Sequence, residues 1–187
     1  MSLKKELLRL EVWYKGRKWF TIAIIKQSFT EYKNTILSEV ISNTDIVKAL
    51  VIGSEDFLTR IPTVEEQEKL DDPNGLIRKQ IFPYKGVPFT TIKNDSYITT
   101  AFYNFKKKNN AFINGVVQFY IFTPIDKEKT CEGIRYDFIA DKLEEIFNDT
   151  GIGVFEFQGR SDVDISKEGY LCHMVIFEIM DFRIGGR

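Results

Sequence analysis

Alternating apolar and polar residues predict that the chain begins with a β-hairpin over Leu8–Ile25, turning at a Lys-Gly pair. The segment Leu3–Leu10 is also compatible with a short helix, because it is rich in Lys, Glu and Leu. Apolar residues then recur at helical spacing, which predicts a helix over Ser28–Asn43 and a second, shorter helix over Asp45–Leu50. The first third of the chain is therefore a hairpin followed by helices.

The second half of the chain has a strong strand pattern interrupted by one helix. Aromatic and β-branched residues predict an antiparallel pair of strands, Tyr97–Phe105 and Phe112–Phe122. An amphipathic helix is expected over Gly133–Asn148, followed by a strand at Val154–Phe157 and a long final strand at Tyr170–Phe182. This order predicts an α+β fold, a mainly antiparallel sheet with helices packed on one face.

The segment between these halves, residues 54–96, is the least regular. Four of the five prolines lie in it: Pro62, Pro73, Pro83 and Pro88. Its one clear element is a short acidic helix over Val64–Leu70, where Thr63 and Glu66 have the spacing of a capping box. We expect a single domain over residues 1–187, with a basic hairpin in 1–26, a loop-rich insertion in 54–96, and the hairpin, helix and two strands in 97–182.

Composition excludes several classes of protein. Of the 187 residues, 43% are hydrophobic and 28% are charged, which is typical of an ordered globular chain. Apolar runs are too short for a membrane span, and the N-terminus lacks an apolar signal core, so neither a membrane nor an exported protein is expected. Cys131 and Cys172 have no CxxC spacing and His173 is the only histidine, which argues against a structural zinc site and a multi-histidine metal site. We also expect no cofactor.

The net charge of −1 conceals an asymmetry along the chain. Residues 1–26 carry seven Lys or Arg and two Glu, whereas residues 126–187 carry eight basic and fourteen acidic residues. Opposite charges at the two ends suit head-to-tail association between copies, although solvated surfaces would have the same composition.

Few residues have the spacing of a catalytic or binding site. Asp162-Val163-Asp164 places two carboxylates on one side of an extended chain, as in a cation chelate, but no third acidic ligand follows. Cys172 and His173 are neighbours in a strand and therefore point to opposite faces. The segment Lys106–Asn110 has the composition of a phosphate contact or of a soluble hairpin tip. We expect no catalytic residues, no metal site and no enzymatic activity.

The segment Asn114–Phe182 carries a resemblance to a known family. A strand ending in Thr123-Pro124 is followed by an acidic amphipathic helix (Ile134–Phe147), a short strand, an Asp-containing loop and the closing strand Leu171–Met180. This order resembles that of the tail-terminator and tail-completion proteins of long-tailed bacteriophages, which also have a helix near the N-terminus, here Ser28–Asn43. The basic hairpin and the insertion depart from that pattern, which leaves open another neck or head-completion protein.

The resemblance implies a structural virion protein. Copies would form a hexameric ring that terminates the tail tube and joins it to the head, contacting the tail tube protein and the head-neck connector proteins. DNA would pass through the lumen without specific binding, and the protein would reside in the host cytoplasm during assembly and then in the tail or neck of the virion. The alternatives are another neck connector and a small metal-dependent enzyme that uses Asp162 and Asp164.

Two further expectations concern stability and the lumen. If the long strands pack on the helix over 133–148, Phe138→Ala should cost about 3–5 kcal/mol, as large-to-small core substitutions do. The polar loop Gly159–Gly169, with Asp162 and Asp164, is expected at the ring lumen or the tube interface, where its acidic charge would keep DNA from binding.

The basic hairpin is expected to form an intersubunit contact. A lone two-stranded hairpin is marginally stable, and exposed tryptophans are costly, so Trp13 and Trp19 would anchor it on a neighbouring subunit. Lys15, Arg17 and Lys18 would then face an acidic surface. In the alternative, the hairpin completes the sheet of its own subunit.

Overall fold

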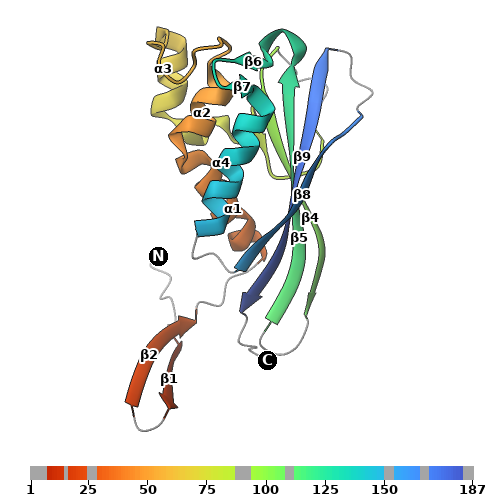
Figure 1. Ribbon diagram of the computed structural model, residues 1–187. Coiled ribbons are helices and arrows are strands. Elements are labelled where there is room, and N and C mark those ends of the chain that lie inside the picture. The colour runs from red at the N-terminus through yellow and green to blue at the C-terminus, as the bar shows by residue number, and fades with distance from the viewer. Residues whose placement is uncertain are drawn as a thin grey trace.

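The structure is a computed structural model that describes residues 8–14, 17–24, 29–86, 94–107, 112–149, 154–164 and 169–182 (Figure 1). In chain order the elements are β1 (Leu8–Tyr14), β2 (Arg17–Ile24), α1 (Phe29–Ser42), α2 (Thr44–Val51), α3 (Val64–Asp71), η1 (Pro73–Leu76), β3 (Ile81–Phe82), β4 (Tyr97–Lys107), β5 (Phe112–Pro124), η3 (Ile125–Lys127), β6 (Lys129–Thr130), β7 (Gly133–Ile134), α4 (Arg135–Asp149), β8 (Val154–Asp162) and β9 (Tyr170–Phe182).

A five-stranded sheet in the order β3-β4-β5-β9-β8 forms the centre of the molecule. Its long strands pair antiparallel, and β5 pairs with β9 along its whole length, from Phe112 opposite Phe182 to Pro124 opposite Tyr170. Only the short β3 is parallel to its neighbour β4. The predicted α+β fold with a mainly antiparallel sheet is confirmed.

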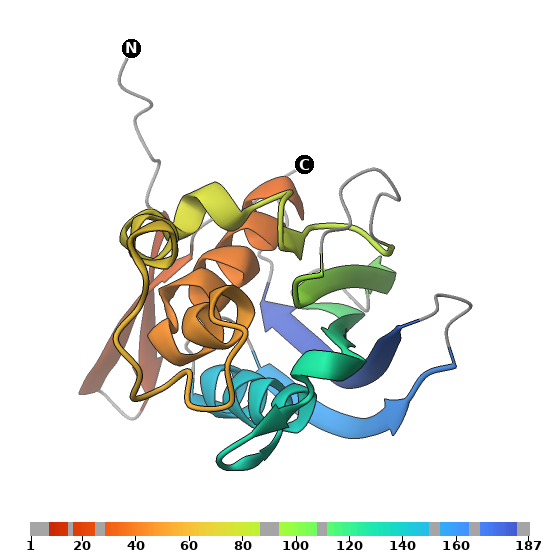
Figure 2. The ribbon, with the colours of Figure 1, turned by 90° about the horizontal axis from the view of Figure 1, so that it is seen from above.

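Helices α1, α2 and α4 cover one face of the sheet (Figures 1 and 2). Side chains alternate along the central strands, so every second residue enters the core between sheet and helices. From β5 and β9 these are Val117, Phe119, Ile121, Val175, Phe177 and Ile179. Phe147 of α4 is 1% exposed and stacks on Phe119 and Phe155, with ring centroids 5.2 and 4.8 Å away. The core therefore lies where the strand and helix patterns placed it.

The helix over 133–148 differs in detail from the prediction. Gly133 and Ile134 belong to the two-stranded β6–β7 sheet, so the helix begins at Arg135 and Ile134 is 40% exposed. Phe138 is only partly buried and packs edge-on against Phe57, 5.1 Å between centroids. The expected cost of 3–5 kcal/mol for Phe138→Ala is therefore too high, because this ring lies at the border of the core.

The insertion 54–96 takes part in the core. The capping box of α3 is present: the Thr63 side chain accepts from the backbone of Glu66, and the Glu66 side chain accepts from the backbone of Thr63. Beyond α3, Leu76 and Ile81 are buried in the main cluster, and β3 adds to the sheet. The described prolines of this segment, Pro62, Pro73 and Pro83, lie outside α3 and β3 and do not exclude the segment from the core.

Arg135 is a fully buried arginine that links α4 to the end of α2. Its guanidinium donates to the carbonyls of Lys127 (2.7 Å), Ala49 (2.8 Å), Ile52 (2.8 Å) and Ser54 (2.7 Å). The last carbonyls of a helix have no partner within the helix, and they carry partial negative charge. Burial lowers the pKa of Arg135 to about 10, so the side chain stays protonated at neutral pH. The cation therefore satisfies the carboxyl end of α2.

The expectation of a polar loop from Gly159 is wrong in its first part. Strand β8 continues to Asp162, and residues 159–162 pair with β9. A β-bulge between Phe157 and Gly159 shifts the register, and Gly159 has a φ of 147°, which is accessible chiefly to glycine. A Gly-containing polar stretch reads as a turn in the sequence, but here it is a bulge inside an edge strand.

Strands β1 and β2 form a two-stranded sheet of their own, with a bulge between Val12 and Trp13. Figure 1 shows this hairpin at the opposite end of the molecule from α3. Among the described helices, none combines the length and the apolar character that crossing a membrane requires.

Candidate functional site

The residues predicted as an interface lie in or beside the N-terminal hairpin. Trp13 belongs to β1, whereas Arg17, Lys18 and Trp19 belong to β2. The backbone of these strands is described, but their side chains, and the whole of Lys15, lie outside the described residues. The contact that they were expected to make stays a prediction.

The two predicted lumen residues are in different environments. Asp162 is the last residue of β8, opposite His173 of β9, and its Oδ1 lies 2.9 Å from His173 Nδ1. Asp164 follows the strand and is exposed. The structure thus pairs Asp162 with the histidine, a partner that the sequence analysis missed. Across the described ranges, no cluster of three or more His, Cys, Asp or Glu is placed to hold a metal ion.

His173 is held between the sheet and α4. It is 7% exposed, and its ring stacks on Tyr136 with centroids 4.9 Å apart. With the Nδ1 proton directed to Asp162, Nε2 is buried without a hydrogen-bond partner among the described residues, and Asp137 Oδ1 lies 4.0 Å away. Burial, followed by the charges of Asp162 and Asp137, raises the pKa of Tyr136. This cluster connects the end of β8 to α4.

Cys172 confirms the predicted alternation of faces. It lies in a small apolar cluster with Ala101 and Tyr120 on the sheet face opposite the helices, away from His173. Burial, with a smaller contribution from the charge of Asp162, raises the pKa of the Cys172 thiol to about 12. A thiolate–imidazole pair between these neighbours is therefore excluded by geometry.

A second connection holds β8 against α4. The Arg160 guanidinium donates through Nη2 to Asp141 (2.6 Å) and through Nε to Glu144. Both acidic residues lie on the helix side of the strand, one turn apart. Among the strands that the structure describes, β9 is the one neighbour of β8 in the sheet, so these contacts hold an edge strand against α4.

The end of the molecule around α3 has a different character, and we call it the α3 surface. It comprises exposed acidic residues together with two exposed apolar side chains: Ile61, Val64, Glu65, Glu68, Asp71 and Asp72. Ile61 is 87% and Val64 77% exposed, and no residue of α3 is buried. Residues 54–72 carry seven acidic and two basic residues. The surface is strongly negative with an apolar part.

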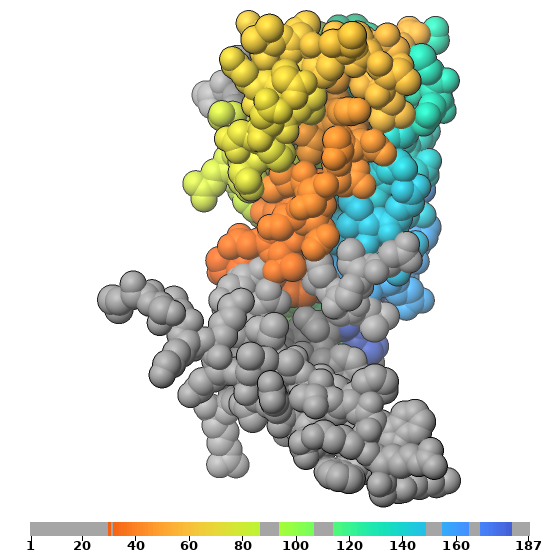
Figure 3. Space-filling view, turned by 90° about the vertical axis from the view of Figure 1, so that its left-hand side faces the viewer, coloured from red at the N-terminus to blue at the C-terminus, as the bar shows by residue number. Residues whose placement is uncertain are grey.

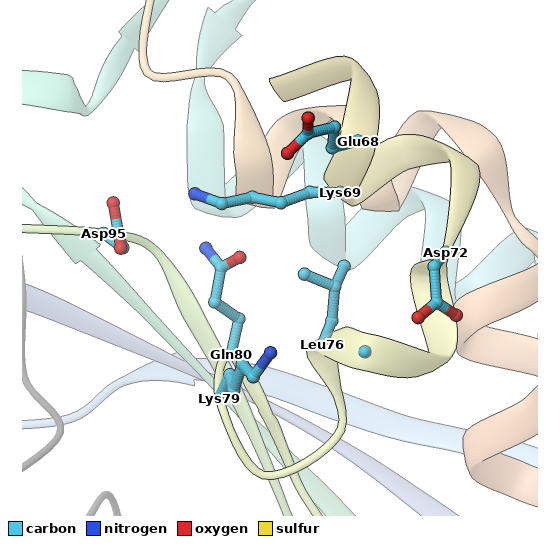
Figure 4. Close-up of a pocket in the computed structure, with 8 residues that line it drawn as sticks. Glu68, Lys69, Asp72, Leu76, Lys79, Gln80 and Asp95 are labelled. Carbon is cyan, nitrogen blue, oxygen red and sulfur yellow. The ribbon is translucent and has the colours of Figure 1, made fainter. Parts of the chain in front are cut away.

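A pocket of about 370 Å³ opens beside α3 (Figure 4). It is lined by Glu68, Lys69, Asp72, Gly75, Leu76, Lys79, Gln80 and Asp95. Gln80 is 5% exposed, and its Nε2 donates to the carbonyls of Leu50 (2.8 Å) and Ser96 (3.3 Å). These bonds orient the amide so that the side chain points into the pocket, and none of the described residues donates to Oε1. The pocket therefore presents a fixed acceptor among carboxylates and two amines.

The α3 helix was predictable from its capping box, but the pocket was not. Its walls come from α3, η1 and the segments that flank β3 and β4, and these meet only in the folded chain. A glutamine between basic and apolar residues carries no sequence signal for such a role.

Comparison with known proteins identifies one family. The family model described as YomW matches residues 43–179, from the residue that caps α2 to near the end of β9. The matched segment contains α3, the pocket and the five-stranded sheet except for the last three residues of β9, and leaves out β1, β2 and α1. Among curated proteins, none matches the chain.

Proposed function

The chain belongs to the YomW family, which is phage-associated, and from this premise we propose that it is a structural protein of the phage tail, of the tail-terminator type. Copies form a hexameric ring that ends the tail tube and joins it to the head. Its partners are other copies, the tail tube protein and the head-neck connector proteins. It acts in the host cytoplasm during assembly and in the virion afterwards, without a cofactor and without catalysis.

The order of elements within the matched segment is the observation that carries this proposal. In the structure, the long elements that Asn114–Phe182 forms are β5, α4, β8 and β9, and α4 packs on the strands. This is the order on which the resemblance to tail-terminator proteins rests, and the family match covers the segment through residue 179. A phage-associated family and a tail-terminator order together favour a role in the tail.

The sheet supports an assembly role through its edges. β8 is the last strand at one side, and at the other side β3 covers only two residues of β4. Among the described residues, no further strand pairs with β8 or with the rest of β4, so both edges offer backbone to a neighbouring copy. An interface between two different surfaces of one chain generates a ring when the rotation closes.

In this ring we place the end of β8, with Asp162 and Asp164, toward the lumen or the tube interface. Negatively charged carboxylates at this place do not neutralise DNA phosphates, so no counterions are released and binding gains no free energy from their release. The duplex therefore passes without specific binding. The double replacement Asp162→Asn with Asp164→Asn separates assembly from catalysis. An assembly protein keeps forming rings with these neutral residues, whereas an enzyme that chelates a cation with both carboxylates loses turnover.

Deletion of the gene from the phage or prophage that encodes the chain tests the proposed function. A tube that lacks its terminator keeps polymerising and does not join a head, so we expect filled heads without tails and tails of irregular length. A plasmid copy of the wild type, and of the double Asn variant, should restore tailed particles. Tailed particles at normal yield and length without the gene would overturn the proposal, and filled heads with tails of normal length would indicate another neck protein.

A further inference from the structure

We propose that the α3 surface of one copy binds the basic N-terminal segment, residues 1–26, of a second copy, so that copies associate head to tail. The inference rests on the proposed function, since it supplies a contact from which the ring is built. It places the acidic partner surface in residues 54–72, whereas the sequence analysis noted an acidic excess only in residues 126–187.

Charge complementarity is the first argument. The segment 1–26 has a balance of +5, and residues 54–72, which include α3, have a balance of −5. The α3 side chains of Glu65 and Glu68 are exposed. Lys69 also lies within this surface. Glu66 is already paired with Arg60 at 2.7 Å, so a basic partner would meet the other acidic residues of the surface, Glu65, Glu68, Asp71 and Asp72. Complementary potentials steer association and fix its orientation.

The position of the two surfaces decides between one copy and two. In Figure 1 the β1–β2 hairpin and α3 lie at opposite ends of the molecule, and Figure 3 shows the region of α3 forming the top of the molecule. The hairpin of one copy is therefore placed to meet the α3 surface of a neighbouring copy, because the α3 surface of its own copy lies at the far end of the molecule. The contact joins two different surfaces, so it propagates from copy to copy and closes into a ring when the rotation permits.

The pocket and the apolar residues give the surface a chemistry beyond negative charge. Gln80 Oε1, held by the bonds that Nε2 makes, is an acceptor without a donor among the described residues, and the carboxylates of Glu68, Asp72 and Asp95 line the same pocket. A lysine or arginine side chain supplies donors to all of these groups.

Beside the pocket, two apolar side chains are almost fully exposed, Ile61 and Val64. Within one copy, the exposure of Ile61 and Val64 means that these two side chains contribute little to the apolar core. The N-terminal segment holds both tryptophans of the chain, Trp13 and Trp19, so it offers the apolar area that this surface would cover. A basic, Trp-containing segment therefore matches the α3 surface in both charge and apolar character.

Sedimentation of the purified full chain over a range of concentrations tests the inference. The variant Glu65→Lys with Glu68→Lys should weaken self-association about tenfold or more at low salt, and added salt should weaken the wild type in the same direction. The matched control, Glu132→Lys with Glu178→Lys, changes the net charge equally at exposed residues elsewhere and should associate as the wild type does. Because α3 buries no residue, unchanged thermal melting will show that the variants are folded.

A charge swap makes the test specific to the two surfaces. Arg17→Glu with Lys18→Glu should weaken association as the α3 variant does, and mixing the two variants should restore it, since each then meets a complementary surface. Wild-type association by the α3 variant, a monomeric wild type at every concentration, or failure of the mixture to associate would overturn the inference. These results do not depend on the phenotype of the gene deletion, so the interface and the proposed function can fail separately.

Discussion

Replacing Arg135 with methionine removes the buried cation that satisfies the end of α2. Two of its acceptors, the carbonyls of Ala49 and Ile52, lie in fully buried bonds of 2.8 Å, and water does not readily replace the lost donors there. Each buried group left unsatisfied costs about 1–3 kcal/mol, so the two together cost about 2–6 kcal/mol. The carbonyls of Lys127 and Ser54 are partly accessible and add less, because water can bond to them. We expect a loss near 4 kcal/mol, a large part of the stability of a typical domain.

Urea unfolding followed by circular dichroism measures this loss as a lower midpoint at unchanged slope. Arg135→Lys keeps the charge but offers one nitrogen in place of a planar fork, so it should recover less than half of the lost stability. Arg78→Met makes the same change at an exposed arginine and should be nearly neutral. A loss below about 1 kcal/mol for Arg135→Met, or full recovery by lysine, would refute the account of α2 termination.

Three further predictions concern the core, the thiols and the α3 cap. Phe147→Ala should cost about 4 kcal/mol, because its ring is 1% exposed and stacked on both sides, whereas Phe138→Ala should cost about half as much; equal midpoints in urea would contradict this ranking. At pH 8 a thiol reagent should modify one cysteine of the folded chain, the exposed Cys131, and both after unfolding. Because burial raises the pKa of Cys172 from 9.0 to about 12, its contribution to stability is intact below pH 9 and is lost as the pH rises towards 12. Rapid modification of a second thiol in the folded chain would show that Cys172 is not buried. Thr63→Ala removes one half of the capping box and should destabilise α3 by about 1 kcal/mol, measurable as faster amide exchange in that helix, while unchanged exchange would contradict the cap.

Local patterns were sufficient to predict much of the fold. The alternation of β5 and the amphipathic spacing of α4 depend on neighbours within a few residues, and both place the core correctly. The cap at Thr63 is equally local, because its partner Glu66 is three residues away. Such patterns can be recognised in the sequence because they do not depend on the rest of the chain.

The features that escaped prediction depend on distant partners. Gln80 bonds to Leu50, 30 residues away, and Arg135 bonds to Ala49, 86 residues away, so neither role leaves a pattern in the surrounding sequence. The Asp162–His173 contact depends on the register between β8 and β9, which the bulge at Gly159 sets. The family match indicates a phage association, while the surfaces that would build a ring are visible only in the folded molecule.

Cryo-electron microscopy of particles from the phage or prophage that encodes this chain tests the central claim most directly. The account predicts a closed ring of copies at the junction of the tail tube and the head, with density that accommodates the five-stranded sheet and its covering helices. Absence of the chain from the particles, or its presence away from this junction, would contradict the account.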